Sequence, residues 1–115
     1  MSERLAAGFV LAFAAFAVLA AKPDLDYERL RASLDSLAAD PVLGKLASGE
    51  RGLAEQAVEL LTTDRSGGKD GRAFRVYMAE WRVEAAVAAA QAANQQNQLD
   101  ALNREHDRIL LQAAQ

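Results

Sequence analysis

The chain has no cysteine, which excludes disulfide bonds, thiolate zinc sites, thiol nucleophiles and lipid attachment at an N-terminal cysteine. Histidine is almost as scarce, because His106 stands alone. A metal site of the helix-bundle type needs a Glu-x-x-His motif on two helices, and the residue three positions before His106 is Asn103. We therefore expect no metal and no cofactor.

A strong excess of charge of one sign is also missing. The 13 basic and 16 acidic residues are interspersed and leave a net charge of -3. Nucleic-acid-binding domains and proteins attracted to anionic membranes usually present a basic patch. We expect no binding to nucleic acid, and membrane contact only through the N-terminal segment described below.

Catalytic motifs are weak. Glu80 and Glu84 lie one helical turn apart, as do Glu55 and Glu59, but no neighbouring base or third group accompanies either pair. The glycine-rich stretch at residues 66–71 lacks the first glycine and the final Ser or Thr of a phosphate-binding loop. We expect the protein not to be an enzyme.

The N-terminal segment has the features of an export signal or a membrane anchor. Residues 5–21 contain no charge, follow Arg4 and precede Lys22 and Pro23. Small residues favour a signal peptide cleaved before Ala21, with cleavage one residue later as a weaker choice. The length, which reaches the lower limit of about 17 residues for a spanning helix, favours an uncleaved inner-membrane anchor. Both alternatives place residues 22–115, the expected helical domain, in the periplasm. A buried helix of a cytoplasmic protein is disfavoured, because this small chain has little else to cover it.

One apolar stripe organises the rest. Over residues 71–113 apolar residues recur at alternating steps of four and three, which predicts one long helix with a coiled-coil-like seam against other helices. Glu84 and Glu105 lie on one flank of this seam, and Arg75 and Arg82 on the other. The seam comprises Phe74, Met78, Trp81, Ala85, Ala88, Ala92, Gln95, Leu99, Leu102, His106, Ile109 and Ala113.

Before this helix the chain reads as a broken helical arm over residues 24–63, with its main break at Asp40 and Pro41. A polar loop around Gly67 and Gly68 then turns the chain back. We predict an all-α fold: an elongated antiparallel helical hairpin with a kinked first arm (residues 24–63) and one long second helix (residues 71–113), preceded by a hydrophobic N-terminal helix. Matching the arms pairs Leu30 with His106, Leu34 with Leu102, Leu37 with Leu99, and Leu53 with Trp81. So thin a core favours self-association or a protein partner.

The aromatic end of the long helix is the candidate binding site, comprising Phe74, Tyr77, Met78 and Trp81. We expect Met78 and Trp81 in the core and Tyr77 and Val83 partly exposed. Aromatic residues dominate interface energetics, so this end is the best anchor for a partner's helix or a small apolar ligand. The amide-rich block at residues 94–98 either fixes the register of packed helices or faces solvent.

Three stretches carry a family resemblance: residues 40–47 (DPVLGKLA), 77–84 (YMAEWRVE) and 102–113 (LNREHDRILLQA). Together they resemble the alanine-rich helical domain of unknown function of Gram-negative envelope proteins, which often follows an export signal and precedes an OmpA-like peptidoglycan-binding domain. Trp81 departs from that pattern, where arginine is commoner, and no OmpA-like domain follows here. The resemblance implies a periplasmic location and a helical architecture, and it brings no catalytic residues.

Overall fold

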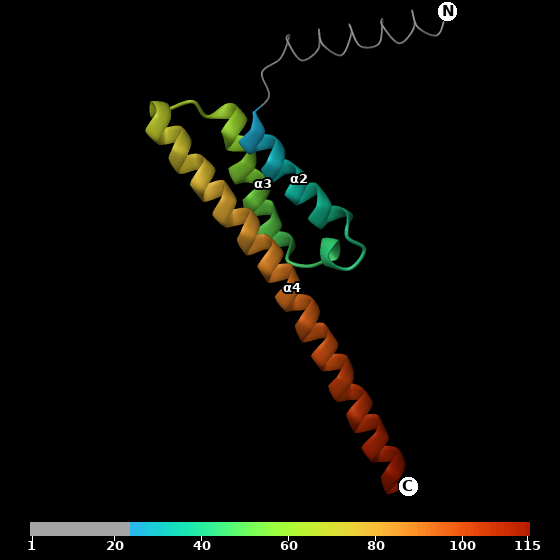
Figure 1. The fold of residues 1–115 in the computed structure, drawn as a ribbon. Helices are drawn as coiled ribbons and strands as arrows, with labels where there is room; N and C mark the ends of the chain where they lie inside the picture. Colours follow the sequence, from blue (N-terminus) through green and yellow to red (C-terminus); the bar gives the residue numbers. More distant parts are fainter. Residues whose placement is uncertain (1–23) are drawn as a thin grey trace, which may run out of the picture.

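The computed structural model describes residues 24–115, so the expected export segment at residues 5–21 lies outside the described residues. The described part contains helix α2 (Leu25–Ala39), a short 3-10 turn η1 (Leu43–Lys45), helix α3 (Ser48–Thr63) and helix α4 (Gly68–Ala114). No strand occurs within residues 24–115. The predicted all-α class and the long final helix are confirmed (Figure 1).

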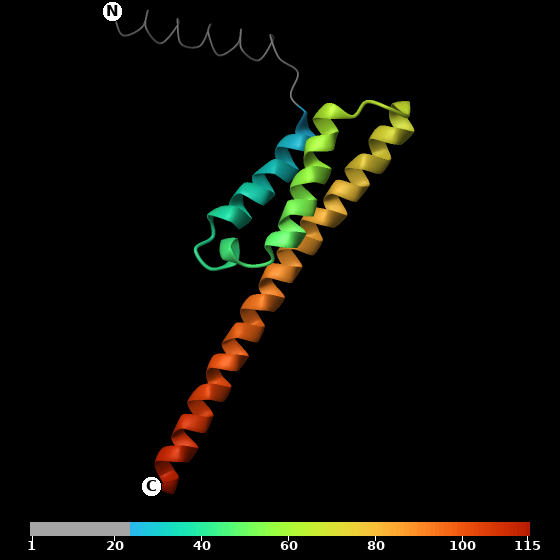
Figure 2. The ribbon, with the colours of Figure 1, turned by 180° about the vertical axis from the view of Figure 1, so that it is seen from behind.

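The three helices form a short bundle with a long extension. Helix α3 runs antiparallel to both α2 and α4, and the first half of α4 packs along α2 and α3 (Figure 2). The second half of α4 continues past the end of the bundle in both views. None of the helices over residues 24–115 is long and apolar enough to cross a lipid bilayer.

The predicted break at Asp40 and Pro41 is confirmed, and it reverses the chain fully. Asp40 ends α2, and its Oδ1 accepts hydrogen bonds from the backbone N–H groups of Val42 (2.9 Å) and Leu43 (2.8 Å). Gly44 then passes so close to α2 that a Cβ there would collide with the Ala38 carbonyl oxygen. The first arm is therefore itself a helical hairpin, and it covers only about half of α4.

A left-handed residue starts each of the two later helices. Ala47, with φ of 53°, precedes α3, and Gly67, with φ of 78°, precedes α4. The loop between α3 and α4 is tightened by Asp64, whose Oδ1 accepts from the Ser66 N–H (2.9 Å) and hydroxyl (2.6 Å). This compact loop lets α4 begin three residues earlier than the predicted start at Gly71.

The core is built from leucines on α2 and, apart from Leu61 of α3, smaller residues on the other two helices. Four of its members are fully buried small side chains, which lets the helix axes approach closely. The core comprises Leu30, Leu34 and Leu37 of α2, Ala54, Val58 and Leu61 of α3, and Ala79, Val83, Ala86 and Ala90 of α4.

The predicted seam does not face this core. Successive helical residues are rotated by about 100°, so Trp81 lies about 200° from both Ala79 and Val83 around α4. Trp81 is 50% exposed, which corrects the expectation that it is a core residue. Ala79 and Val83 are instead the residues that α2 and α3 cover.

Three of the four expected pairings between the two arms, those of Leu30, Leu34 and Leu37, are also wrong. Leu34 and Leu37 are buried in the bundle, whereas Leu99 and Leu102 are 50% and 67% exposed beyond it. Likewise Leu30 is buried, whereas the His106 side chain is 70% exposed. The physical reason is the reversal at Asp40, which shortens the first arm to about half of the length that the matching assumed. Leu53 lies along one groove with Met78 and Arg82, and its expected pairing with Trp81 stays a prediction.

Candidate interaction surface

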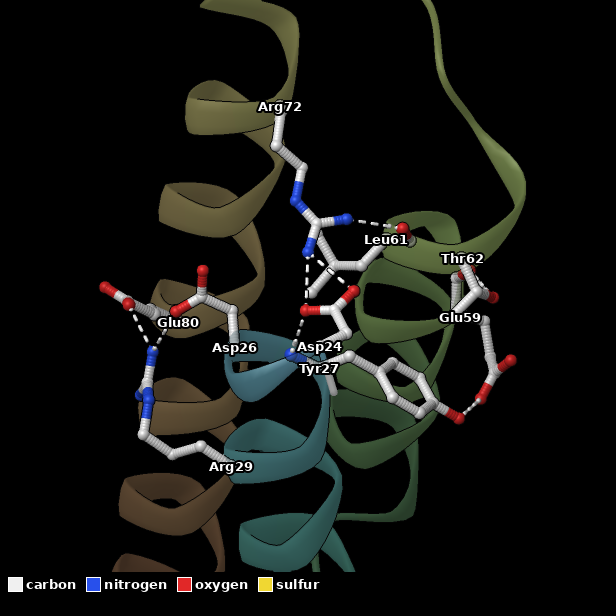
Figure 3. Close-up of polar contacts among 9 residues, drawn as sticks. All are labelled: Asp24, Asp26, Tyr27, Arg29, Glu59, Leu61, Thr62, Arg72 and Glu80. Atoms are coloured by element: carbon white, nitrogen blue, oxygen red, sulfur yellow. Dashed lines mark hydrogen bonds and ion pairs between the residues drawn. The ribbon is translucent and has the colours of Figure 1, made fainter. Parts of the chain in front are cut away.

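An arginine clamp fixes the three helices at the loop end of the bundle (Figure 3). Arg72 of α4 donates to both carboxylate oxygens of Asp24 at 2.8 Å and to the Leu61 carbonyl of α3 at 2.5 Å. Asp24 also caps α2 by accepting from the Tyr27 N–H at 3.1 Å. The Tyr27 N–H and, after it, the Arg72 guanidinium lower the pKa of the Asp24 carboxyl below its ordinary value.

Two further polar contacts bind α2 to its neighbours in the same view. Arg29 donates to Glu80 of α4 at 2.6 Å, and the Tyr27 hydroxyl donates to Glu59 of α3 at 3.2 Å (Figure 3). These side chains are largely solvent-exposed, so each contact contributes little to stability. These contacts nevertheless engage one carboxylate of each pair noted in the sequence, Glu80 of the pair with Glu84 and Glu59 of the pair with Glu55.

The four residues of the predicted site gather on the outer side of the first turns of α4. Phe74, Tyr77 and Trp81 are 63%, 64% and 50% exposed, and Met78 is half-buried. The Arg82 guanidinium carbon lies 5.0 Å from the centroid of the Trp81 ring, a cation–π contact. The expected exposure of Tyr77 is confirmed, and the expected burial of Trp81 is not. Val83, which we expected to be partly exposed, is 5% exposed in the core.

Part of this site borders a shallow groove of about 280 Å³ between α3 and α4. Phe74 and Met78 belong to the α4 wall of the groove. The α3 wall includes Leu53 and Leu60, which the sequence had not predicted as part of the site. The groove is lined by Leu53, Gln56, Ala57 and Leu60 of α3 and by Phe74, Arg75, Met78 and Arg82 of α4.

Leu53 and Leu60 were missed because α3 carries two adjacent apolar stripes. Residues 54, 58 and 61 enter the core, whereas residues 53, 57 and 60 form the stripe one position earlier. The sequence shows both stripes, and only the packing reveals which of them is left over. Leu53 and Leu60 are each 46% exposed.

Arg75 anchors the end of this groove to the loop. Its Nη1 donates to the Ser66 carbonyl at 2.8 Å and lies 3.7 Å from Asp64 Oδ1. Its Nε is buried without a hydrogen-bond partner in the described part of the chain. The side chain is 12% exposed, so it acts as a packed wall of the groove as well as a charge.

The extension of α4 presents the rest of the predicted seam to solvent. Every residue from 101 to 115 is exposed, and Gln95 and three of its four amide neighbours in block 94–98 are exposed as well. Large apolar side chains in this half of the helix are Leu99, Leu102, Ile109, Leu110 and Leu111, with exposed fractions of 50%, 67%, 52%, 55% and 67%. Extended shape and exposed apolar residues together favour a partner or self-association.

No group of three or more His, Asp or Glu side chains within residues 24–115 is placed to hold a metal ion. Comparison with known proteins adds no relative: no family model, curated protein or solved structure matches the chain. The exposed apolar surface is therefore the main structural guide to function.

Proposed function

We propose that the protein is a non-enzymatic, exported helical module of the bacterial cell envelope that acts by binding protein. The observation that carries this proposal is the outer face of α4, where mostly apolar residues recur from Phe74 to Ala113 and all except half-buried Met78 and Ala85 are exposed. Exposed apolar surface of this extent marks a site of protein association in a water-soluble domain.

The location rests on the sequence. The uncharged segment at residues 5–21 has the composition of an export signal, and the three stretches described above resemble a periplasmic helical family. We place residues 22–115 in the periplasm, either free or held at the inner membrane by residues 5–21.

A binding role is preferred to catalysis because one carboxylate of each pair singled out in the sequence is engaged in a contact between helices. Glu80 is paired with Arg29, Glu59 with Tyr27, and Asp24 with Arg72. Each contact joins two helices and is at least partly exposed, whereas a catalytic pair needs a shielded pocket and a neighbouring base.

The groove beside the aromatic end supports a second candidate function, in which the protein holds a partner's helix or a small apolar ligand. Its walls combine Leu53 and Leu60 with Phe74 and Met78, and cationic Arg75 and Arg82 stand at its edges. A volume of about 280 Å³ is at the lower end of small-molecule sites, so the ligand would be small or would enter only in part.

Export is tested by the intact mass of the protein recovered from a Gram-negative host, with periplasmic and membrane fractions analysed separately. A species beginning at Ala21 or Lys22 in the periplasm, or a full-length species in the inner membrane, supports the proposal. A full-length species confined to the cytoplasm overturns it.

Binding at the aromatic end is tested with a photo-reactive amino acid at Tyr77, crosslinked in living cells. The matched control carries it at Ala101, which is exposed but lies on the side of α4 away from the seam. Crosslinks at residue 77 that disappear in a Trp81→Ala background, with unchanged helicity, support a protein partner. Equal crosslinking at both positions argues against a specific site.

The groove is tested with an apolar fluorescent probe, 1-anilinonaphthalene-8-sulfonate. If the groove binds apolar ligands, the wild type enhances probe fluorescence and Leu60→Asn reduces that enhancement several-fold. Leu102→Asn, a matched change far from the groove, should leave it unchanged. Equal loss in both variants would exclude the groove as the ligand site.

A further inference from the structure

We propose that the outer face of α4 pairs with α4 of a second copy of this chain, in antiparallel orientation, as a two-stranded coiled coil. This inference rests on the proposed function, because it names the partner of the same apolar surface.

The periodicity of the outer face is the first argument. Helix α4 carries two apolar faces, and α2 and α3 cover the one that contains Ala79, Val83 and Ala86. The other, largely exposed face repeats every 3.5 residues from Phe74 to Ala113, through the bundle and along the extension. A sustained 3.5-residue repeat suits a helix that supercoils with another helix of similar length. Within the described chain the element of that length is α4 itself.

The sizes of the seam residues select the antiparallel orientation. Ala85 and Ala92 lie in the bundle half of the seam, whereas Leu102 and Ile109 lie in the extension. Parallel pairing in register sets each alanine against the same alanine and leaves thin layers. Antiparallel pairing centred near Asn97 sets Ala85 against Ile109, Ala92 against Leu102, and each extension against the other copy's bundle.

The charges that flank the seam agree with this register. In an antiparallel pair, each flank of the seam meets the same flank of the second copy. The acidic flank contains Glu84 and Glu105. Centred near Asn97, Glu84 faces Gln112 of the second copy and Glu105 faces its Gln91, so each carboxylate meets an amide. A slide of one heptad toward fuller overlap would set Glu84 against Glu105 twice, and like charges repel.

The extension would gain helical stability from such a partner. Roughly 20 residues of α4 lie beyond the bundle, and most of a helix's stability in proteins comes from packing of its apolar face. The pairing covers exposed Leu99, Leu102 and Ile109 and involves roughly 20 residues on each copy, at the lower end of the usual range for stable interfaces.

The orientation is tested on the full chain by distances between spin labels, which the absence of native cysteine makes straightforward. Labels are attached to Asn97→Cys in one sample and to Leu111→Cys in another, both on the side of α4 away from the seam. Antiparallel pairing leaves the Asn97 labels close together and adds about 42 Å of axial separation at Leu111, from 1.5 Å per residue. Equal short distances at both positions mean a parallel dimer and overturn the proposal.

The surface is tested by light scattering on two neighbouring substitutions in the extension. Leu102→Asp puts a charge into the seam and should weaken dimerisation at least about tenfold, whereas Ala101→Asp puts the same charge on the opposite face and should not. Both residues lie outside the bundle, so the bundle's folding is not at risk. A wild-type monomer at all accessible concentrations, or equal effects of both substitutions, overturns self-pairing.

Failure of this inference is separable from failure of the proposed function. A periplasmic monomer that crosslinks to another envelope protein through residue 77 overturns the dimer and supports the exported interaction module. An antiparallel dimer found only in the cytoplasm supports the pairing and overturns export.

Discussion

Asp24 joins two tasks that are usually separate, since it caps α2 and receives the arginine that ties α4 to α3. Capping requires an acceptor oxygen, and the Arg72 contact gains from a negative charge. The substitution Asp24→Asn would keep the first function and lose most of the second, so substitutions here separate the two contributions.

We expect Asp24→Ala to lower the free energy of unfolding by about 1 kcal/mol, mainly through loss of the helix cap. Asp24→Asn should cost less than half of that, because its side-chain oxygen still accepts from the Tyr27 N–H. Urea unfolding followed by circular dichroism measures both. Equal losses would mean that the Arg72 ion pair, rather than the cap, carries the effect.

Acid should destabilise the bundle through three aspartates. Backbone N–H groups of Leu43 and Val42 lower the pKa of Asp40, the Ser66 hydroxyl and N–H lower that of Asp64, and the pKa of Asp24 is lowered as described. Each folded pKa lies below the ordinary 3.8, so the unfolded chain binds more protons at low pH. Stability is therefore full well above pH 3.8 and is lost as pH falls through the folded pKa values.

Thermal unfolding between about pH 2 and pH 6 measures this dependence. The double variant Asp24→Asn with Asp40→Asn should show a flatter profile than the wild type in the acid range. An unchanged slope would show that these aspartates have the same pKa values in the folded and unfolded chain.

At the scale of elements, the start of α3 carries strain that a substitution can relieve. Ala47 has a left-handed backbone, which disfavours any residue with a Cβ. We expect Ala47→Gly to raise the free energy of unfolding by about 0.5 to 1 kcal/mol, against the usual direction for glycine. Ala47→Val should destabilise the protein in the same urea assay. A loss of stability in Ala47→Gly would show that the packing of the methyl group outweighs the strain.

The two halves of α4 make a matched pair of substitutions possible. Ala86 is fully buried, and Ala101 lies on the same side of the helix but beyond the bundle. Ala86→Leu should overpack the core and cost about 1 to 3 kcal/mol. Ala101→Leu should change stability by less than about 0.5 kcal/mol. Similar costs at both sites would mean that the extension is packed against α2 or α3.

The sequence predicted the elements better than their arrangement. Asp24, Asp40 and Gly67 are local signals for a helix start, a stop and a turn, and each acts in the structure as expected. The apolar stripe of α4 was also read correctly as one uninterrupted helix. Local signals depend on neighbours in sequence, so a single chain contains the information needed to find them.

The face that α4 buries could not be found in this way. Ala79, Val83 and Ala86 form a weaker stripe than Phe74, Met78 and Trp81, yet α2 and α3 cover the weaker one. The hydrophobicity of a stripe does not indicate whether it packs against the same chain or against another molecule. The candidate site was half predicted for the same reason: its α4 residues were named, and Leu53 and Leu60 were not.

At the scale of the whole molecule, bundle and extension should differ in local stability. Amides of the bundle half of α4 are protected by packing, whereas the extension of a monomer has only its own helical hydrogen bonds. In dilute solution we expect amides of residues 99–112 to exchange with deuterium at least about 100-fold faster than those of residues 79–90. Hydrogen exchange measured by mass spectrometry at rising protein concentration should then show increasing protection of the extension. Equal protection in both halves at high dilution would contradict this picture.

The unbroken course of α4 also has a mechanical consequence. One helix without proline runs from the Arg72 clamp to Ala114, so the bundle and the extension turn as one lever. The arm beyond Ala90 is about 36 Å long, and a tilt of the bundle by about 10° displaces its tip by about 6 Å. A displacement of α2 and α3 would therefore reach the far end of the extension while the extension stays helical, because no proline or glycine follows Gly71 in α4.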